Sequence, residues 1–428
     1  MHKNENRPGY KKTKVGWIPE GWDHARLEKF STVKTGPFGA QLHESDYVEN
    51  GTPIITVEHL SESGVLHKNL PLVSDEDKGR LSQYLLKSGD IVFSRVGSVD
   101  RNSLISESEN GWLFSGRLLR VRPDLNKICP RYLSNYFHQH SFKHHMRSIA
   151  VGGTMACLNT NLLSRVPINI PPLAEQEAIA AVLECWDGGI GNLELRIVKK
   201  KRIKKVLMQR LLSGKSRLPG FSKPWNNVKL GEVLTEHKEE SSGAEEVHSV
   251  SVHKGVINQV EHLGRSFAAK DTANYNLVKP GDIIYTKSPT GDFPYGIIKQ
   301  STLDKDVIVS PLYGVFTPMT IYLGVMLDAY FASPVNTGNY LRPIIQKGAK
   351  NTINITNSTF MSGKLNLPLD KKEQQAIAEV LTAADREIEA LERKLALWKE
   401  QKKYLLNNLV TGTIRLPEFV KNSPQKST

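Results

Sequence analysis

The sequence predicts an α+β protein with two tandem α/β domains, joined and separated by two long antiparallel helices. Three observations predict this class. The chain has 428 residues, which is enough for two or three domains. One segment occurs twice, and each copy has the apolar spacing of a long helix. Short β-rich runs bounded by glycine and proline precede each copy.

The internal repeat is the most informative feature. Residues 175–183 read EQEAIAAVL and residues 373–381 read EQQAIAEVL. The offset of 198 residues continues without a gap to Phe221 and Phe419, with 21 of 47 aligned positions identical. Solenoid repeats have periods of roughly 20–50 residues, so this period is too long for a solenoid. The chain therefore contains two copies of one domain-plus-connector unit.

Each connector is expected to be a helix of about 40 residues, or about 60 Å at 1.5 Å per residue. Its apolar residues alternate steps of three and four, which is the spacing of a heptad seam that packs against another helix. The seam positions, which we expect at a helix interface, include Ile179, Leu183, Ile190, Leu193, Ile377, Leu381, Ile388 and Leu391. Lys200 and Lys204 interrupt the first seam. We expect the two helices to pair antiparallel with pseudo-two-fold symmetry; the alternative is that each folds back on its own block.

These patterns set the expected organisation of the chain. The expected parts are a first domain at 1–172, a central connector helix at 173–215, a second domain at 216–368, a C-terminal connector helix at 369–413 and a tail at 414–428. The expected strands are 52–57, 90–93, 118–121, 282–285, 297–299 and 307–309, with helices near 131–146 and 321–332. A Gly-Asp-Ile segment at 89–91 recurs at 281–283, so the two blocks are expected to share a scaffold.

Composition favours a polyanionic partner. The chain has 57 Lys and Arg against 44 Asp and Glu, a net charge of +13, which favours nucleic acid. A run of about 18 apolar residues, as in a transmembrane helix, is absent from the sequence. The N-terminus lacks the apolar stretch of a secretory signal. The three cysteines form no CxxC pair, so a reducing cytoplasm is the expected location.

The sequence contains no complete catalytic motif of the kinds considered below. Residues 169–173 (NIPPL) have one residue too many and no aromatic for the Asn-Pro-Pro-aromatic motif of adenine methyltransferases. Gly214-Lys215-Ser216 resembles the end of a phosphate-binding loop, but Gln209 replaces its first glycine, so a helix stop is expected. The triplet at 76–78 is expected to be a solvated turn rather than a nuclease site. His138, His140, His144 and His145 are expected on one helix, without a second ligand pair for zinc.

Basic and glycine-rich loops are the candidate DNA contacts. Residues 34–39 combine a cation, a hydroxyl, glycines and an aromatic, and residues 94–98 follow a strand. An arginine there can contact guanine bidentately in the major groove. Residues 286–291 take the matching place in the second block. The candidate DNA-binding residues are Lys34, Phe38, Arg95, Ser98, Arg101, Arg147, Lys287, Thr290, Arg342, Lys347, Lys350 and Asn351. A plain surface role is the alternative for each.

Residues 199–205 hold six cations. Their position on the first connector is compatible with a solvated helix face, with contact to DNA phosphates, or with contact to an acidic partner.

Taken together, these segments resemble the specificity subunits of type I restriction-modification systems. The two connectors PPLAEQEAIAAVL (171–183) and EQQAIAEVL (373–381) are similar to the family's repeated connectors. GPFGAQL (36–42), SGDIVFSRVGS (88–98) and GGTMACLNTNLLSRVPI (152–168) are similar to segments of its recognition domains. The second block departs from the family pattern, because it has no clear Gly-Pro-Phe-Gly loop near its start.

The resemblance implies two target-recognition domains, each reading half of a split double-stranded DNA sequence, with the helices fixing the gap between the half-sites. It implies docking of two modification (methyltransferase) subunits and association with restriction (translocase and nuclease) subunits. S-adenosylmethionine, ATP and magnesium are then expected in those partners, and no cofactor in this chain. Two alternatives remain open from the residues: the recognition part of a larger restriction-methylation enzyme, and a helical scaffold without DNA specificity.

Overall fold

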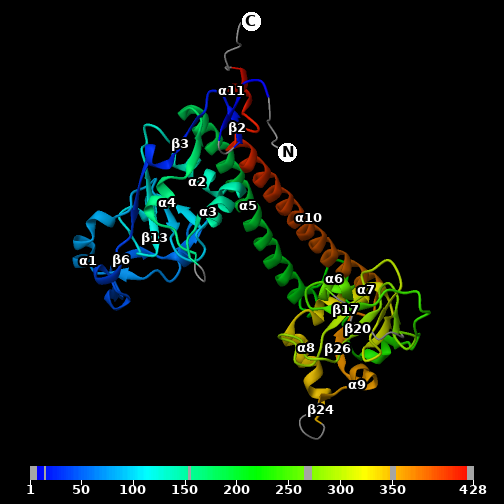
Figure 1. Ribbon diagram of the computed structural model, residues 1–428. Helices are drawn as coiled ribbons and strands as arrows, with labels where there is room; N and C mark the ends of the chain where they lie inside the picture. The colour runs from blue at the N-terminus through cyan, green and yellow to red at the C-terminus, as the bar shows by residue number, and fades with distance from the viewer. Residues whose placement is uncertain (1–6, 14–15, 153–155, 265–271, 348–352, 422–428) are drawn as a thin grey trace. The chain divides into compact units, whose positions relative to one another are not determined.

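The computed structural model describes residues 7–13, 16–152, 156–264, 272–347 and 353–421 (Figure 1). Its contacts divide the chain into two units. Unit 1 consists of Met1–Glu194 with Lys394–Thr428, and unit 2 consists of Leu195–Arg393. Each unit therefore combines one β-rich block with part of both long helices. The predicted α+β class with two long helices is confirmed.

Unit 1 contains two four-stranded sheets with the strand orders β11-β10-β13-β4 and β12-β6-β9-β5. Its strands are β1 (Tyr10–Thr13), β2 (Gly16–Pro19), β3 (Asp23–Arg26), β4 (Ser31–Thr35), β5 (Tyr47–Val48), β6 (Thr52–Ile55), β7 (Leu60–Ser61), β8 (Gly64–Val65), β9 (Leu72–Val73), β10 (Ile91–Ser94), β11 (Asn102–Leu104), β12 (Leu113–Phe114), β13 (Leu118–Pro123) and β14 (Pro167–Ile170). Its shorter helices are α1 (Asp75–Arg80), α2 (Pro130–His138), α3 (His140–Ile149), α4 (Thr160–Ser164), α11 (Pro417–Lys421), η1 (Leu27–Lys29), η2 (Gly39–Gln41), η3 (Glu44–Asp46), η4 (Val57–His59), η5 (Ser82–Tyr84) and η6 (Glu107–Glu109).

Unit 2 has a four-stranded antiparallel sheet with the order β16-β23-β20-β21 and several two-stranded pairs. Its strands are β15 (Asn226–Lys229), β16 (Leu234–Glu236), β17 (His248–Ser251), β18 (Gly255–Asn258), β19 (Asn276–Val278), β20 (Ile283–Tyr285), β21 (Ile298–Gln300), β22 (Val307–Val309), β23 (Gly314–Pro318), β24 (Gln346–Lys347), β25 (Ile353–Asn354) and β26 (Lys364–Leu367). Its shorter helices are α6 (Gln259–Leu263), α7 (Ile321–Phe331), α8 (Pro334–Leu341), α9 (Asn357–Ser362), η7 (Leu230–Glu232) and η8 (Arg342–Ile344).

The two units share a sheet scaffold, as the recurring Gly-Asp-Ile segment predicts. The order β4-β13-β10-β11 in unit 1 is repeated as β16-β23-β20-β21 in unit 2, and every neighbour in both sheets is antiparallel. Gly89 and Gly281 both have φ of +87°, a conformation that favours glycine. The next residue, Asp90 or Asp282, accepts a 2.8 Å hydrogen bond from a main-chain N–H three residues earlier. The same turn thus leads into β10 and β20.

The long helices are α5 (Leu173–Leu211) and α10 (Lys371–Leu409), each of 39 residues. They lie side by side and run antiparallel within each unit (Figure 1). In unit 1, Asp187 pairs with Lys402 at 2.5 Å and Glu194 with Lys399 at 2.6 Å. In unit 2, acids of α10 pair with the two lysines that interrupt the apolar seam: Lys200 with Glu387 at 2.8 Å, and Lys204 with Asp385.

Apolar packing carries most of the stability of these helix pairs, because exposed ion pairs contribute only about 0–1 kcal/mol each. In unit 1, Ile179 and Leu183 belong to the same core as Leu406 and Leu409. In unit 2, Leu211 of α5 packs with Ile377 and Leu381 of α10. The remaining seam residues Ile190, Leu193 and Ile388 are buried, and Leu391 is half-buried.

A buried glutamate anchors the start of each long helix. The Glu175 carboxylate accepts hydrogen bonds from Trp22 Nε1 (3.1 Å) and from Arg415 Nε and Nη2 (2.8 Å each). In the second copy, Glu373 accepts hydrogen bonds from Trp225 Nε1 (3.3 Å) and from Arg217 Nε (2.6 Å) and Nη2 (2.7 Å). Each glutamate thus binds two segments that are distant in sequence. One is the tryptophan near the start of the β-rich block in the same unit, and the other is the Arg-Leu-Pro segment that follows the partner helix.

Two local expectations are wrong. The four histidines do not share one helix, because the chain turns at Gln139 between α2, which ends at His138, and α3. Burial lowers the pKa of His138 to about 4. The triplet at 76–78 is not a turn; it lies in α1, which Ser74 caps by accepting a hydrogen bond from the Asp77 N–H at 3.1 Å. A serine followed by three acids favours a helix start.

The helix stop predicted at Gly214 is confirmed, since α5 ends at Leu211 and Gly214 has φ of +68°. Of the helices that the structure describes, none has the length and apolarity to cross a membrane. Within the same described ranges, no three His, Cys, Asp or Glu side chains are grouped as metal ligands would be.

Candidate nucleic-acid interface

In unit 1, three chain segments meet where β4 and β10 end and β13 begins. The Arg95 N–H donates to Arg117 O at 2.9 Å, and the Gly36 N–H donates to Leu118 O at 3.1 Å. The segment around Cys157 joins them, because the Gly97 N–H donates to Ala156 O at 2.8 Å and the Leu158 N–H to Arg95 O at 2.8 Å. The loops at 36–39 and 94–98, both of which hold candidate DNA-binding residues, therefore lie at one edge of the sheet.

Close backbone packing fixes the Gly-Pro-Phe-Gly loop on this edge. A Cβ atom on Gly36 would lie 2.2 Å from Ser115 O, and one on Gly116 would lie 2.4 Å from Pro37 O. Any side chain at position 36 or 116 would clash with this backbone, so both positions require glycine. The loop presents Phe38 with 60% of its surface exposed. The Arg95 guanidinium lies 5.7 Å from the centre of that ring and donates from Nη1 to Gly116 O at 3.3 Å.

Other candidates of unit 1 contact protein groups. Arg101 Nη2 donates to Leu60 O at 2.5 Å, and Arg147 Nη2 pairs with Asp100 at 2.5 Å. The hydrogen bond that Arg147 donates to Asp100 raises the pKa of Arg147. The exposed Ser98 accepts the Arg101 N–H through its carbonyl at 3.1 Å. Arg101 and Arg147 thus brace the 98–101 turn.

Lys34 lies in β4 opposite Arg120 of β13. Its Nζ donates to Gln83 Oε1 at 2.7 Å and lies 4.7 Å from the centre of the Tyr84 ring. Burial, and then the charges of Arg120 and Arg122, lower the pKa of Lys34. Lys34 therefore belongs to a cluster of three cations on neighbouring strands.

Unit 2 has an equivalent edge, where β16 and β20 end and β23 begins. Lys287 follows β20 and has φ of +61°, a left-handed conformation that costs an L-residue about 1–2 kcal/mol. A Cβ atom on Gly296 would lie 2.8 Å from the Lys287 N atom, so the neighbouring backbone is tightly packed there. Burial lowers the pKa of Lys287. Thr290 is exposed and forms an isolated antiparallel β-bridge with Phe293.

Sequence reasoning missed three residues at these edges. Arg117 is exposed in unit 1 between Gly116 and β13; the string SGRLLR is the signal that would have found it. In unit 2, Asn357 Nδ2 donates to Glu236 Oε1 at 2.8 Å at the end of β16. Neither Glu236 nor Asn357 has a sequence signal, because they lie 121 residues apart.

The remaining candidates lie after α8. Arg342 is exposed and begins η8, and Lys347 lies in β24, opposite Ile353 of β25. Lys350 and Asn351 lie outside the described residues.

Lys287→Gly is expected to stabilise unit 2 and to weaken DNA binding. Glycine adopts positive φ without strain, so we expect the free energy of unfolding to rise by about 1 kcal/mol. The substitution also removes a cation from the edge, so DNA affinity should fall. Chemical denaturation and DNA titration of the full chain measure both. Lys287→Ala is the control: it should lose DNA affinity equally without the gain in stability. If the two variants were equally stable, the positive φ of Lys287 would not be a source of strain.

Comparisons with known proteins match most of the chain to DNA specificity subunits. The family model described as type I restriction modification DNA specificity domain matches residues 19–200 and 222–397. A putative type I restriction enzyme specificity subunit, MjaX of Methanocaldococcus jannaschii, is 26% identical over 97% of this chain and 98% of its own length. The S subunit from M. genitalium shares the fold, with a TM-score of 0.54 at 12% identity, covering 91% of this chain and 96% of its own. The HsdS subunit from Thermoanaerobacter tengcongensis does so with a TM-score of 0.52 at 17% identity, covering 93% and 98%.

Proposed function

The chain belongs to the type I restriction-modification DNA specificity family, and we propose that each of its units reads one half of a split DNA target. A specificity subunit recognises DNA for a restriction-modification complex and is not an enzyme on its own. One observation supports the assignment of one half-site to each unit. The same four-strand sheet occurs in both units, and a basic residue, Arg95 or Lys287, follows the central strand at the same edge of each.

The edge in unit 1 has the chemistry of a base-reading surface. Arg95 can donate to guanine O6 and N7, and a fixed, exposed Phe38 suits apolar contact with a thymine methyl group. The edge in unit 2 differs, since it combines Lys287 with Glu236 and Asn357. A glutamate accepts from cytosine N4, and the hydrogen bond from Asn357 Nδ2 orients Glu236. Different side chains on the same scaffold support two different half-site sequences.

The long helices are proposed to set the gap between the half-sites and to dock two modification subunits. Both helices continue across the boundary between the units. Support for docking comes from exposed apolar residues on the part of α5 in unit 2: Leu195 (61%), Val198 (56%), Ile203 (53%) and Val206 (42%). At about 100° per residue these four positions fall on one side of α5, and a contiguous exposed apolar patch marks a protein interaction site. The partners would supply S-adenosylmethionine, ATP and magnesium chemistry, and restriction subunits would complete the complex.

Arg95→Ala and Lys287→Ala are expected to alter different halves of the DNA target. Each lost base contact should cost about 1–3 kcal/mol and relax one position, whereas a lost phosphate contact would weaken all sequences equally. Binding selection from a randomised DNA pool, with the variant chain in its modification complex, reports both halves at once.

The matched control is Lys399→Ala. It removes one charge from α10, where Lys399 pairs with Glu194, and should leave both half-sites unchanged. If Arg95→Ala and Lys287→Ala relaxed the same half-site, the assignment of one half to each unit would be wrong.

A further inference from the structure

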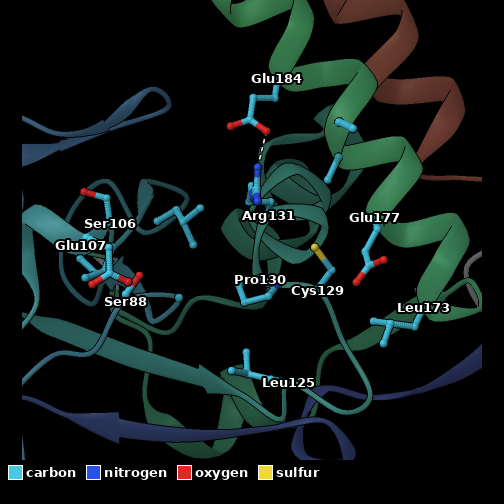
Figure 2. A pocket seen from close by; sticks show the side chains of 15 residues that line it. Ser88, Ser106, Glu107, Leu125, Cys129, Pro130, Arg131, Leu173, Glu177 and Glu184 are labelled. Atoms are coloured by element: carbon cyan, nitrogen blue, oxygen red, sulfur yellow. Dashed lines mark hydrogen bonds and ion pairs between the residues drawn. The ribbon is translucent and has the colours of Figure 1, made fainter.

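Unit 1 has an open groove of about 910 Å³ between its first sheet and the start of α5 (Figure 2). Its walls come from the turn before β10, the segment from β11 to η6, the start of α2 and the first three turns of α5. The groove lies at the beginning of β10, whereas Arg95 and the candidate DNA edge lie at the end of that strand. A partner in this groove and DNA at the edge would therefore approach opposite ends of β10.

The groove combines apolar surface with carboxylates. Ala181 of α5 is exposed in its wall, and Leu125 at its border has 63% of its surface exposed. Glu107, Glu177 and Glu184 line the same space and are exposed, and Figure 2 shows Glu184 paired with Arg131. In a chain with a net charge of +13, this local excess of acid disfavours a nucleic acid here. It favours an occupant with apolar and basic side chains.

The second repeat does not reproduce this chemistry. Ala181 corresponds to Glu379, and Glu177 corresponds to Gln375, whose Nε2 donates to Glu379 Oε1 at 2.8 Å. Leu104 of β11 lines the groove, but its counterpart in β21 is Gln300. The Gln300 side chain is buried and donates to Gly281 O at 3.1 Å and to Ile321 O at 3.0 Å. Two exposed positions of the groove are thus polar in unit 2, and a third is occupied by a buried glutamine, so the two units offer different contacts.

We propose that the groove of unit 1 binds a segment of a modification subunit that carries a lysine or arginine flanked by small apolar side chains. The cation would lie between Glu107 and Glu177, and the apolar side chains would cover Ala181 and Leu125. This inference rests on the proposed function, which supplies the partner; the charge and apolarity of the groove supply the place and the chemistry. An open groove with exposed walls suits a protein segment better than a small ligand, which an enclosed pocket would bury.

The test uses the full chain and the modification subunit of its own system. Ala181→Trp fills the groove and Glu177→Lys reverses its charge; both positions are exposed on α5, so the fold should remain intact. Glu379→Trp and Gln375→Lys are the matched controls at the equivalent positions of α10. Analytical ultracentrifugation measures subunit affinity, and a separate titration measures DNA binding by the chain alone. We expect each groove variant to weaken subunit binding about tenfold or more, with the controls and DNA binding unchanged.

The possible outcomes distinguish a failure of the groove proposal from a failure of the proposed function. Groove variants that bind the modification subunit as the wild type does would overturn this inference alone. Equal losses in the groove and control variants would also overturn it, because they would place the contact elsewhere. Loss of DNA binding by the groove variants would assign the groove to DNA instead. A wild-type chain that binds no modification subunit would overturn the proposed function, and this inference with it.

Discussion

Glu175→Ala is expected to destabilise unit 1 by about 3–5 kcal/mol, the usual cost of removing one partner from a buried ion pair. The Glu175 carboxylate is fully buried, and Arg415, with 15% of its side chain exposed, donates two hydrogen bonds to it. Without the carboxylate, the Arg415 guanidinium loses two hydrogen bonds and the Trp22 N–H loses the bond to Glu175. Such a loss is a large part of the 5–15 kcal/mol that stabilises a typical domain. Chemical denaturation of the full chain, followed by tryptophan fluorescence, measures it.

Two further variants make this result specific. Glu373→Ala removes the equivalent carboxylate and should destabilise unit 2 to a similar extent, because Arg217 and Trp225 bind it in the same way. Glu194→Ala breaks the exposed pair with Lys399 and should cost no more than about 1 kcal/mol. If Glu175→Ala cost as little as Glu194→Ala, the carboxylate would not be the anchor of the repeat.

A four-residue insertion in the long helices is expected to lengthen the gap in the DNA target by one or two base pairs. Four residues add about 6 Å to a helix, and DNA rises about 3.4 Å per base pair. The insertion near Ala390 of α10 needs a matching one near Lys199 of α5. The reason is that Lys200–Glu387 and Lys201–Glu392 pair across the helices on either side of this point. Sequencing of the methylated target then reads the gap directly.

The control for the insertion is a two-residue insertion at the same places. Two residues turn the helix by about 200°, so the seam residues beyond that point would face solvent and assembly should fail. The four-residue insertion should leave both half-site sequences unchanged. A changed half-site, or an unchanged gap with full activity, would contradict a spacing role for the helices.

The sequence predicted the elements that depend on periodic or repeated patterns. The heptad spacing predicted α5 and α10, and the recurring Gly-Asp-Ile segment predicted the shared sheet. The expected strands at 52–57, 90–93, 118–121, 282–285, 297–299 and 307–309 are present as β6, β10, β13, β20, β21 and β22. These features arise from local apolar patterns and glycine turns, which a single sequence displays.

Other features depend on contacts between distant residues and leave no such pattern. Arg415 binds Glu175 across 240 residues, and Arg147 binds Asp100 across 47. Lys200 and Lys204 interrupt the heptad in the sequence, although their ammonium groups pair with acids of α10. Lys287 has a left-handed conformation where the Gly296 backbone packs closely against it, although a lysine on its own would not predict positive φ.

The measurement that tests the central claim most directly is methylome sequencing of a host that carries this chain with its modification subunits. The host would carry either the wild-type chain or a chain in which residues 216–368 come from another specificity subunit. The wild type is predicted to give one bipartite motif, two short half-sites separated by a fixed non-specific gap. The exchange should replace one half-site and keep the other half-site and the gap. A continuous motif, or an exchange that alters both half-sites, would contradict the account.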